Sequence, residues 1–202
     1  MNMRMPTKDR KREIIQVALN LAFKVGPAQL TTGMIAADLG LSQPAIYKHF
    51  PSKNDLMGEI AQHLSLRITQ NIADARTPDT APIERLRNLV LGHLRLLKEY
   101  PALPEFMIMR EKKDVHLDLQ EVIQSAMKAF NTALASNVKA AIAQGDFRVD
   151  LNAADATTLI FGVIQSLVLR MLVNRNSNIL TTDGARLLDL QLAGFMTTGD
   201  DI

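Results

Sequence analysis

The sequence lacks cysteine and tryptophan entirely, and it carries none of the short motifs that mark common enzyme sites. Without cysteine, disulfide bonds and thiolate metal sites are excluded, which suits a reducing cytosol. Glycine-rich phosphate loops and nucleophile motifs are missing, and His63, His93 and His116 lie too far apart for a recognisable metal-ligand spacing. We therefore expect no enzyme activity, no cofactor and no metal site.

The sequence also lacks a long uninterrupted hydrophobic run. Its basic start is followed by an apolar segment, 14–25, that polar residues interrupt, so no signal peptide is indicated. The most apolar stretch, 159–173, contains Gln165, Ser166 and Arg170 and falls short of the roughly 20 apolar residues that a membrane-spanning helix needs. With 47% hydrophobic and 22% charged residues, the composition predicts a soluble globular protein of the cytoplasm.

The formal net charge of +2 hides an uneven distribution along the chain. Residues 1–53 contain eight Lys/Arg and three Asp/Glu, whereas residues 54–202 contain fifteen and eighteen. A basic amino-terminal part on a neutral-to-acidic remainder is typical of a DNA-binding domain attached to a second domain. A chance distribution of surface charge is the alternative.

The segment 31–56 has the pattern of a helix-turn-helix. Two short amphipathic segments flank Gly40, where a tight turn tolerates a positive φ, and apolar residues on both sides are placed to join two crossing helices. Ser42 stands at an N-cap position, and Pro44 fits the first turn of the second helix. That second helix offers amide, methyl, phenol, ammonium and imidazole groups, which read base edges and bind phosphates. Duplex DNA is the expected partner.

The rest of the chain also has helical periodicity, and no strand pattern competes with it. The turn-forming segment 77–82 is the clearest boundary, and the last two segments are apolar enough to form a homodimer interface. A monomer core is the alternative reading of those two segments. The expected helices outside the helix-turn-helix span about 8–25, 52–75, 83–99, 117–144, 152–174 and 182–197.

The motifs at 30–56 resemble the signature of the tetracycline-repressor (TetR) family of regulators. The resemblance rests on LTT at 30–32, IAADLGLS at 35–42 and AIYKHFPSK at 45–53, and it covers residues 8–60. It implies an all-α fold of about nine helices, with a three-helix helix-turn-helix DNA-binding domain at 1–53 and a ligand-binding and dimerisation domain at 54–202. The remainder of the chain fits the family only in helix number and length.

The resemblance also implies roles for individual residues of the DNA-binding domain. Family positions that face bases correspond to Gln43, Pro44 and Ala45. Positions that contact the sugar-phosphate backbone or adjoining bases correspond to Tyr47, Lys48, His49 and Lys53, and the start of the first motif helix, near a phosphate, corresponds to Thr31 and Thr32. Gly33 departs from the polar or basic residue common there, which places more of the base readout on Gln43. Structural alternatives are ring packing for Tyr47 and a helix cap for His49.

The second domain has no shared motif for its ligand. An inward-facing apolar set with a few polar members is our candidate pocket, and a filled core is the alternative for each member. The candidate ligand-binding residues are His93, Phe106, Met107, Arg110, Met127, Phe130, Phe161 and Gln165.

The sequence therefore predicts a transcriptional regulator of this family that leaves a palindromic operator when a small molecule binds. The resemblance includes chromosome-organising proteins, so the alternative is an architectural or nucleoid-associated DNA binder whose second domain contacts a protein. The sequence identifies neither the effector nor the operator, and it does not separate a repressor from an activator.

Overall fold

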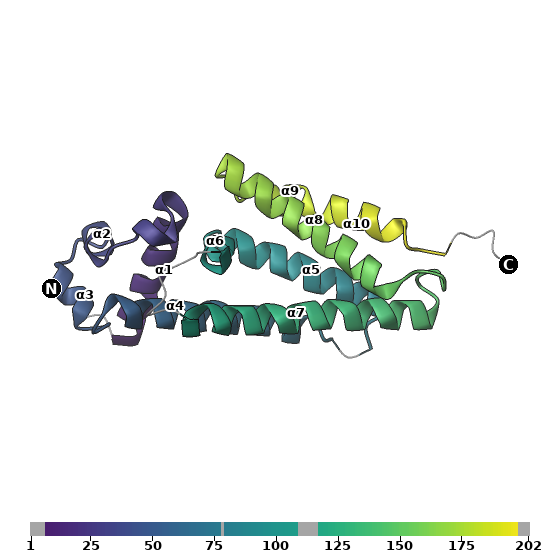
Figure 1. Cartoon of the computed structure of the whole chain (residues 1–202), viewed down its shortest axis with the longest axis horizontal. Helices are drawn as coiled ribbons and strands as arrows, with labels where there is room; N and C mark the ends of the chain where they lie inside the picture. The colour runs from purple at the N-terminus through teal and green to yellow at the C-terminus, as the bar shows by residue number, and fades with distance from the viewer. Residues whose placement is uncertain (1–6, 78, 109–116, 198–202) are drawn as a thin grey trace. The chain divides into compact units, whose positions relative to one another are not determined.

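The structure is a computed structural model that describes residues 7–77, 79–108 and 117–197, and these residues contain helices but no β-strand (Figure 1). The all-α prediction is therefore confirmed. The helix at 103–108, which the sequence pattern had not distinguished, and the single turn α9 are additions. The elements are α1 (Thr7–Val25), the 3₁₀ helix η1 (Pro27–Gln29), α2 (Thr32–Asp38), α3 (Gln43–Tyr47), α4 (Lys53–Asp74), α5 (Pro82–Glu99), α6 (Leu103–Ile108), α7 (Leu117–Gln144), α8 (Ala153–Asn174), α9 (Ile179–Thr182) and α10 (Gly184–Ala193).

Contacts within the chain divide it into two units. Unit 1 takes in the described residues of 1–65 and 100–125, and unit 2 those of 66–99 and 126–202. Both α4 and α7 begin in unit 1 and end in unit 2. The division follows contacts rather than a single cut in the chain, so the domain boundary at 53/54 stays a prediction.

The core of unit 1 joins α1 to the helix-turn-helix (Figure 1). Ile14, Ile35 and Ile46 come from three different helices, and all three side chains are completely buried. Between α2 and α3 the backbone turns at Gly40, whose φ is +64°, so the positive φ expected from the sequence is present. The apolar spacing thus fixes how α2 and α3 are held together.

Side-chain caps define where two of the long helices begin. Ser52 accepts a hydrogen bond from the Asp55 N–H at 3.1 Å and donates to its carboxylate at 2.7 Å, which is a capping-box start for α4. Asn152 caps α8 by accepting from the backbone N–H groups of Ala154 and Asp155. Ser42 holds the N-cap position of α3 with an extended backbone, but its side chain makes no capping hydrogen bond.

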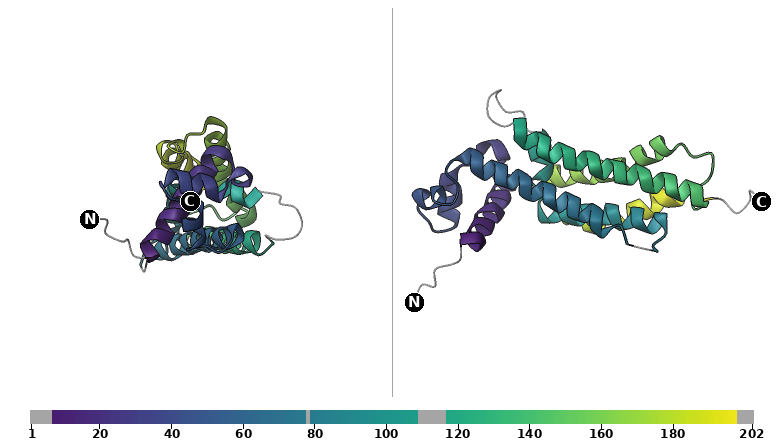
Figure 2. Two further views of the ribbon diagram at one scale, coloured as in Figure 1. Left: turned by 90° about the vertical axis from the view of Figure 1, so that its left-hand side faces the viewer. Right: turned by 90° about the horizontal axis from the view of Figure 1, so that it is seen from below.

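In unit 2, α8 and α10 lie side by side (Figures 1 and 2). At the start of α10, a Cβ on Gly184 would lie 2.5 Å from the Leu94 side chain, so the glycine allows α10 to approach α5 closely. Arg87 on α5 donates to both carboxylate oxygens of Asp189 on α10, at 2.8 and 3.1 Å. This hydrogen-bonded ion pair lowers the pKa of Asp189 below its ordinary value.

The carboxy-terminal helix differs from its prediction at both ends. The single helix expected over 182–197 is instead α9 and α10, and α10 ends at Ala193. Phe195 then packs edge-on against Phe147, which follows α7, with ring centroids 5.7 Å apart. The Arg148 N–H donates to the Phe195 carbonyl at 3.0 Å, so the chain leaves the helix because it pairs with the loop after α7.

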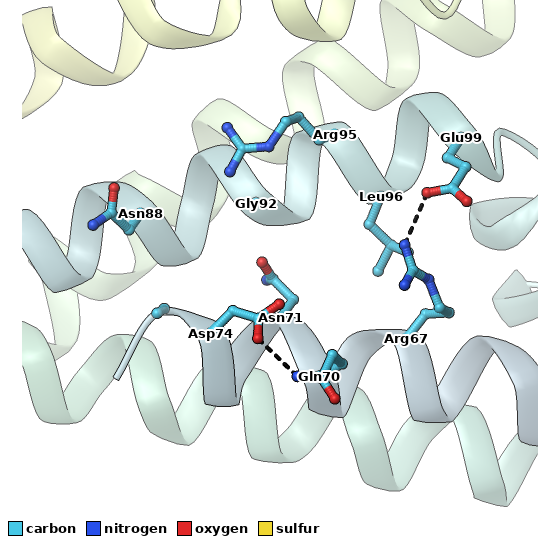
Figure 3. A pocket seen from close by; sticks show the side chains of 10 residues that line it. Arg67, Gln70, Asn71, Asp74, Asn88, Gly92, Arg95, Leu96 and Glu99 are labelled. Carbon is cyan, nitrogen blue, oxygen red and sulfur yellow. Dashed lines mark hydrogen bonds and ion pairs between the residues drawn. The ribbon is translucent and has the colours of Figure 1, made fainter. Parts of the chain in front are cut away.

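One contact between α4 and α5 depends on the absence of a side chain (Figure 3). A Cβ on Gly92 would lie 1.8 Å from the side-chain oxygen of Asn71, which is far too close for two non-bonded atoms. The amide nitrogen of Asn71 donates to the Leu89 carbonyl at 3.0 Å, which holds Asn71 over Gly92. Within unit 2, α4 and α5 are therefore joined by a close polar contact between Asn71 and the backbone at Leu89 and Gly92.

We expect Gly92→Ala to destabilise the protein by about 1 to 3 kcal/mol, because Asn71 must move and lose its hydrogen bond. Denaturant unfolding measures the change. The matched control is Gly58→Ala on α4, which has no atom within 4 Å of the added Cβ and should gain stability from its higher helix propensity. In the double variant Asn71→Ala/Gly92→Ala, the Gly92 substitution should cost much less; strictly additive losses would contradict this contact.

Candidate nucleic-acid interface

The short helix α3 has an exposed outer face, and a buried residue on its inner face holds it in place. Gln43, Pro44 and Lys48 are exposed, Tyr47 is 41% exposed and Ala45 is half-buried. Ile46, between them in sequence, is completely buried and fixes the helix to the core of unit 1. Pro44 lies in the first turn, as expected, where a missing N–H costs no helical hydrogen bond. The predicted base-facing residues are thus carried by a firmly positioned element.

A buried hydroxyl connects α2 to the two longest side chains of α3. Thr32 is only 4% exposed, and its hydroxyl accepts a hydrogen bond from the Gln43 side-chain amide at 2.9 Å. The same hydroxyl lies 3.2 Å from the Tyr47 hydroxyl. These bonds restrict the rotamers of Gln43 and Tyr47 before any ligand arrives. A base edge that meets Gln43 would therefore meet a side chain that is already oriented.

The start of α2 separates the roles of two neighbouring threonines. Thr31 is exposed, and its hydroxyl caps the helix by accepting from the Met34 N–H at 3.2 Å. Thr32, in contrast, turns inward to α3. Both were predicted to lie near a phosphate at this helix start; only the Thr31 side chain is exposed there, and the phosphate contact stays a prediction.

The remaining predicted residues differ in how freely they can act. Lys53 is the first residue of α4 and is half-buried. The Nδ1 atom of His49 is buried and has no hydrogen-bond partner among the described residues. Near the start of α1, Lys11, which was not among the predicted residues, forms an ion pair with Glu59 at 2.5 Å and lies over the ring of Phe50. Lys11 is therefore engaged within unit 1 rather than free for phosphate.

Of the residues predicted to line a ligand pocket, Phe106 and Met107 belong to α6 in unit 1, and Arg110 lies outside the described residues. The other five belong to unit 2: His93, Met127, Phe130, Phe161 and Gln165. His93 is buried and stacks on Phe130 with ring centroids 4.3 Å apart, whereas Gln165 is exposed. Their role in ligand binding stays a prediction.

A groove of about 380 Å³ lies between α4 and α5 in unit 2 (Figure 3). None of the predicted ligand residues lines it. Its lining contains two arginines and two carboxylates, of which Arg67 and Glu99 form an ion pair at 3.0 Å, while Asp74 accepts a hydrogen bond from Gln70 at 2.7 Å. The lining residues are Arg67, Gln70, Asn71, Asp74, Ala75, Asn88, Gly92, Arg95, Leu96 and Glu99.

Sequence reasoning missed two features of these surfaces. The anchoring of Gln43 by Thr32 joins residues eleven apart in sequence, and no local pattern indicates it. The grooves beside the carboxyl end of α4 were also missed. The 77–82 turn brings arginines from both of its sides together, and the polar residues flanking this turn were the signal that could have indicated the grooves.

Two family models match the chain. The model described as "Bacterial regulatory proteins, tetR family" matches residues 14–60, which include all of α2 and α3. The model described as "YsiA-like protein, C-terminal region" matches residues 57–190, about two thirds of the chain. Together they cover both the candidate interface and most of unit 2.

Curated relatives and solved structures agree with these matches. The nucleoid occlusion factor SlmA of Salmonella newport (strain SL254) is 34% identical over 105 residues, and the chain spans about half the length, 51%, of that relative. KstR2, the ketosteroid transcriptional regulator of Mycobacterium tuberculosis, aligns with a TM-score of 0.76 at 17% identity, over 94% of this chain and 96% of its own. Bacillus subtilis FadR in complex with stearoyl-CoA aligns with a TM-score of 0.66 at 22% identity, over 91% and 98%.

We expect Thr32→Val to weaken sequence-specific DNA binding by about three- to tenfold without changing its salt dependence, because Gln43 loses its anchor while the phosphate contacts remain. Gel-shift titration against a specific and a scrambled duplex measures both quantities. Thr31→Val is the matched control, since it removes a helix cap but leaves the Gln43 anchor in place. Unchanged discrimination between the two duplexes in Thr32→Val would rule out the anchoring role.

Burial lowers the pKa of His93 to about 4, so the ring is neutral at pH 7. Its ordinary value of 6.5 applies to the unfolded chain, which therefore binds the extra proton between pH 6.5 and 4. The contribution of the neutral, buried His93 ring to the free energy of unfolding is fully present above pH 6.5. It falls by on the order of 3 kcal/mol as the pH drops to 4. We expect His93→Leu to lose stability less steeply in this window, measured by denaturant unfolding at several pH values. Parallel pH profiles for the two proteins would contradict it.

Proposed function

This chain belongs to the tetR family of bacterial regulatory proteins, and we propose that it is a repressor that a small molecule releases from a palindromic operator. Its general role as a DNA-binding transcriptional regulator follows from the family, which consists of regulators rather than enzymes. Release by an effector, homodimer formation and a cytoplasmic location are typical of the family and belong to the proposal.

The anchoring of Gln43 to the buried Thr32 hydroxyl is the observation that carries the DNA-binding part. An amide held in one orientation suits bidentate contact with an adenine edge in the major groove. Pro44 and Ala45 add apolar surface next to it, and Lys48 and Lys53 supply positive charge on either side of the α3–α4 connection. Base contacts and phosphate contacts are thus separated along one short stretch.

An exposed stripe on α8 supports the homodimer. Leu159, Leu169 and Val173 are 50%, 63% and 73% exposed, and with Gly162 and Ser166 they repeat at alternating spacings of three and four residues. This spacing places them on one face, opposite the buried Ile160, Ile164 and Leu167. On α10, Leu190 is also 68% exposed. A second copy would remove this apolar surface from water, with a two-fold axis placing two α3 helices about 34 to 36 Å apart.

The same helix is long and apolar enough, by length and composition alone, to cross a membrane. Only 28% of its most apolar window is buried within the chain. The stretch 159–173 alone is too short and too interrupted for a span, but the complete helix is 22 residues long. Membership of a family of soluble DNA-binding regulators favours a second copy as the cover for this face.

The long helix α4 supports the release mechanism. It carries Lys53 in its first turn, and its last turns contribute to the groove shown in Figure 3. An effector that binds unit 2 better in a conformation that does not fit the operator would lower DNA affinity by that difference in binding free energy.

We expect Lys53→Ala to weaken binding to specific and non-specific DNA alike and to reduce the slope of log affinity against log salt concentration by about one unit. Gel-shift titrations at several salt concentrations test this, using palindromes from the promoter of the protein's own gene. The matched control is Lys24→Ala, which removes an exposed lysine from the last turn of α1. Absence of salt-sensitive binding to any such palindrome would refute the proposed function.

We expect Leu169→Glu to convert the dimer to monomers, because the two-fold axis places two carboxylates in the apolar interface. Each lost apolar contact costs at least ~1 to 2 kcal/mol, so the dimer dissociation constant should rise about 100-fold. Light scattering coupled to gel filtration measures the mass. Leu66→Glu on α4 alters an equally exposed leucine, 65% exposed, outside the stripe and should leave the dimer intact. Equal masses for both variants would contradict the interface.

The match to SlmA favours a second candidate, a nucleoid-associated DNA binder whose second domain contacts a protein. The relatives concerned are named nucleoid occlusion factors, and the likeness covers only half of their length. A thermal-shift screen with metabolites separates the two functions, because a ligand of the folded state raises the melting temperature. A screen without any shift, together with intact operator binding, would favour the second candidate.

A further inference from the structure

A second concave site in unit 2, lined by Ile72, Ala75, Arg76, Thr77, Arg85, Leu89, Ala133, Ser136 and Asn137, carries an unbalanced positive charge. This arginine pocket has a volume of about 360 Å³ and is formed by the carboxyl end of α4, the first turns of α5 and one face of α7. It contains two arginines, and none of its nine lining residues is acidic. The groove of Figure 3, in contrast, contains two arginines and two carboxylates.

Arg85 is held in place by bonds that leave part of its guanidinium unused. Its Nε donates to the Asn137 side-chain oxygen at 3.2 Å, and its Nη1 donates to the Thr80 carbonyl at 2.7 Å. Asn137 is itself fixed, because its amide nitrogen donates to the Ala133 carbonyl at 2.9 Å. In the described part of the chain, no hydrogen bond of Nη2 accompanies these two. The guanidinium is therefore oriented in advance, with one edge available for an anion.

Three acidic residues lie near the two arginines in sequence, and none of them lines the pocket: Asp74, Asp79 and Glu84. Asp79 is an exposed residue of the turn between α4 and α5. Asp74 accepts a hydrogen bond from Gln70, and Glu84 acts electrostatically on Arg87. Arg76 is exposed at the rim, and no described carboxylate lies within ion-pair distance of it. Two guanidinium groups thus face one pocket without a compensating carboxylate among its walls.

The walls also contain an apolar part. Ile72, Leu89 and Ala133 are each at most 8% exposed, and the hydroxyl-bearing Thr77 and Ser136 lie nearer the solvent. Two arginines beside an apolar floor suit a ligand that combines an anionic group with a small apolar group. The volume of the pocket falls in the range of small-molecule sites. An inorganic ion alone would leave the floor in contact with water.

We propose that the arginine pocket binds a small amphipathic anion, a carboxylate or a phosphate ester, with its charged group on Arg76 and Arg85. The inference deepens the proposed function, on which its regulatory meaning rests, by naming the chemical class of the effector and its place on α4, α5 and α7. An anion there would join the segment after α4, which carries Arg76, to Arg85 on α5.

The test measures binding to the full-length protein by isothermal titration calorimetry, with sodium hexanoate and inorganic phosphate as separate probes and sodium chloride at equal ionic strength as the blank. We expect saturable binding of at least one probe. Arg76→Ala and Arg85→Gln should each weaken it at least tenfold, whereas the matched control Arg95→Ala, an exposed arginine of the other groove, should not. Because Arg76 is exposed, its variant keeps the test valid even if Arg85→Gln is destabilised.

Tighter binding of hexanoate supports an amphipathic carboxylate, whereas tighter binding of inorganic phosphate, which has no apolar group, would contradict the role of the apolar floor. No binding above the chloride blank, or equal affinity in Arg76→Ala and the wild type, would overturn the pocket assignment. Gel shifts with and without the bound probe test the function separately. A probe that binds through the arginines without altering operator affinity supports the site and contradicts effector release through it.

Discussion

One helix must bury a single apolar stripe in two separate cores, and this constraint governs the structure. Leu56, Ile60, Leu64, Ile68 and Ile72 follow one another at four-residue intervals on α4, and each is at most 8% exposed. The first residues of the series belong to unit 1 and the last to unit 2. Because the stripe has no polar interruption, α4 remains one helix between the capping box at Ser52 and the turn after Asp74. Lys53 in the first turn of α4 and the groove-lining residues of its last turns are thereby carried on one continuous helix.

The local parts of this architecture were predictable from the sequence because they depend on local rules. Apolar periodicity and the glycine at position 40 predicted the long helices and the turn close to their observed limits, and in the structure Ser52 and Asn152 cap two of those helices. The final helix was predicted too long because Phe195 prefers a contact with Phe147, a residue far away in sequence. Helix periodicity contains no information about such a competitor.

The candidate site was predicted in position but not in its internal contacts. Gln43 and Tyr47 lie on α3 and Lys48 is its C-cap, and all three are exposed, but their contact with DNA stays a prediction. The motif did not indicate that Thr32 is buried and bonded to two of these side chains. Contacts between helices depend on side-chain directions that a single sequence does not reveal. In unit 2 this limitation is larger, since the two grooves combine residues from helices that are adjacent only after folding.

The segment after α10 pairs with the loop after α7, and this pairing connects the end of unit 2 back to a part of the chain that is far away in sequence. Arg148 and Phe195 share a backbone hydrogen bond, and the Thr197 hydroxyl donates to the Gly145 carbonyl at 3.1 Å. Helices α8 and α10 are consequently tethered to α7 at that end, so neither can slide along its axis without stretching the tether. Moving the end of α10 away from the loop after α7 would therefore break both hydrogen bonds, so that movement carries the free-energy cost of leaving them unmade.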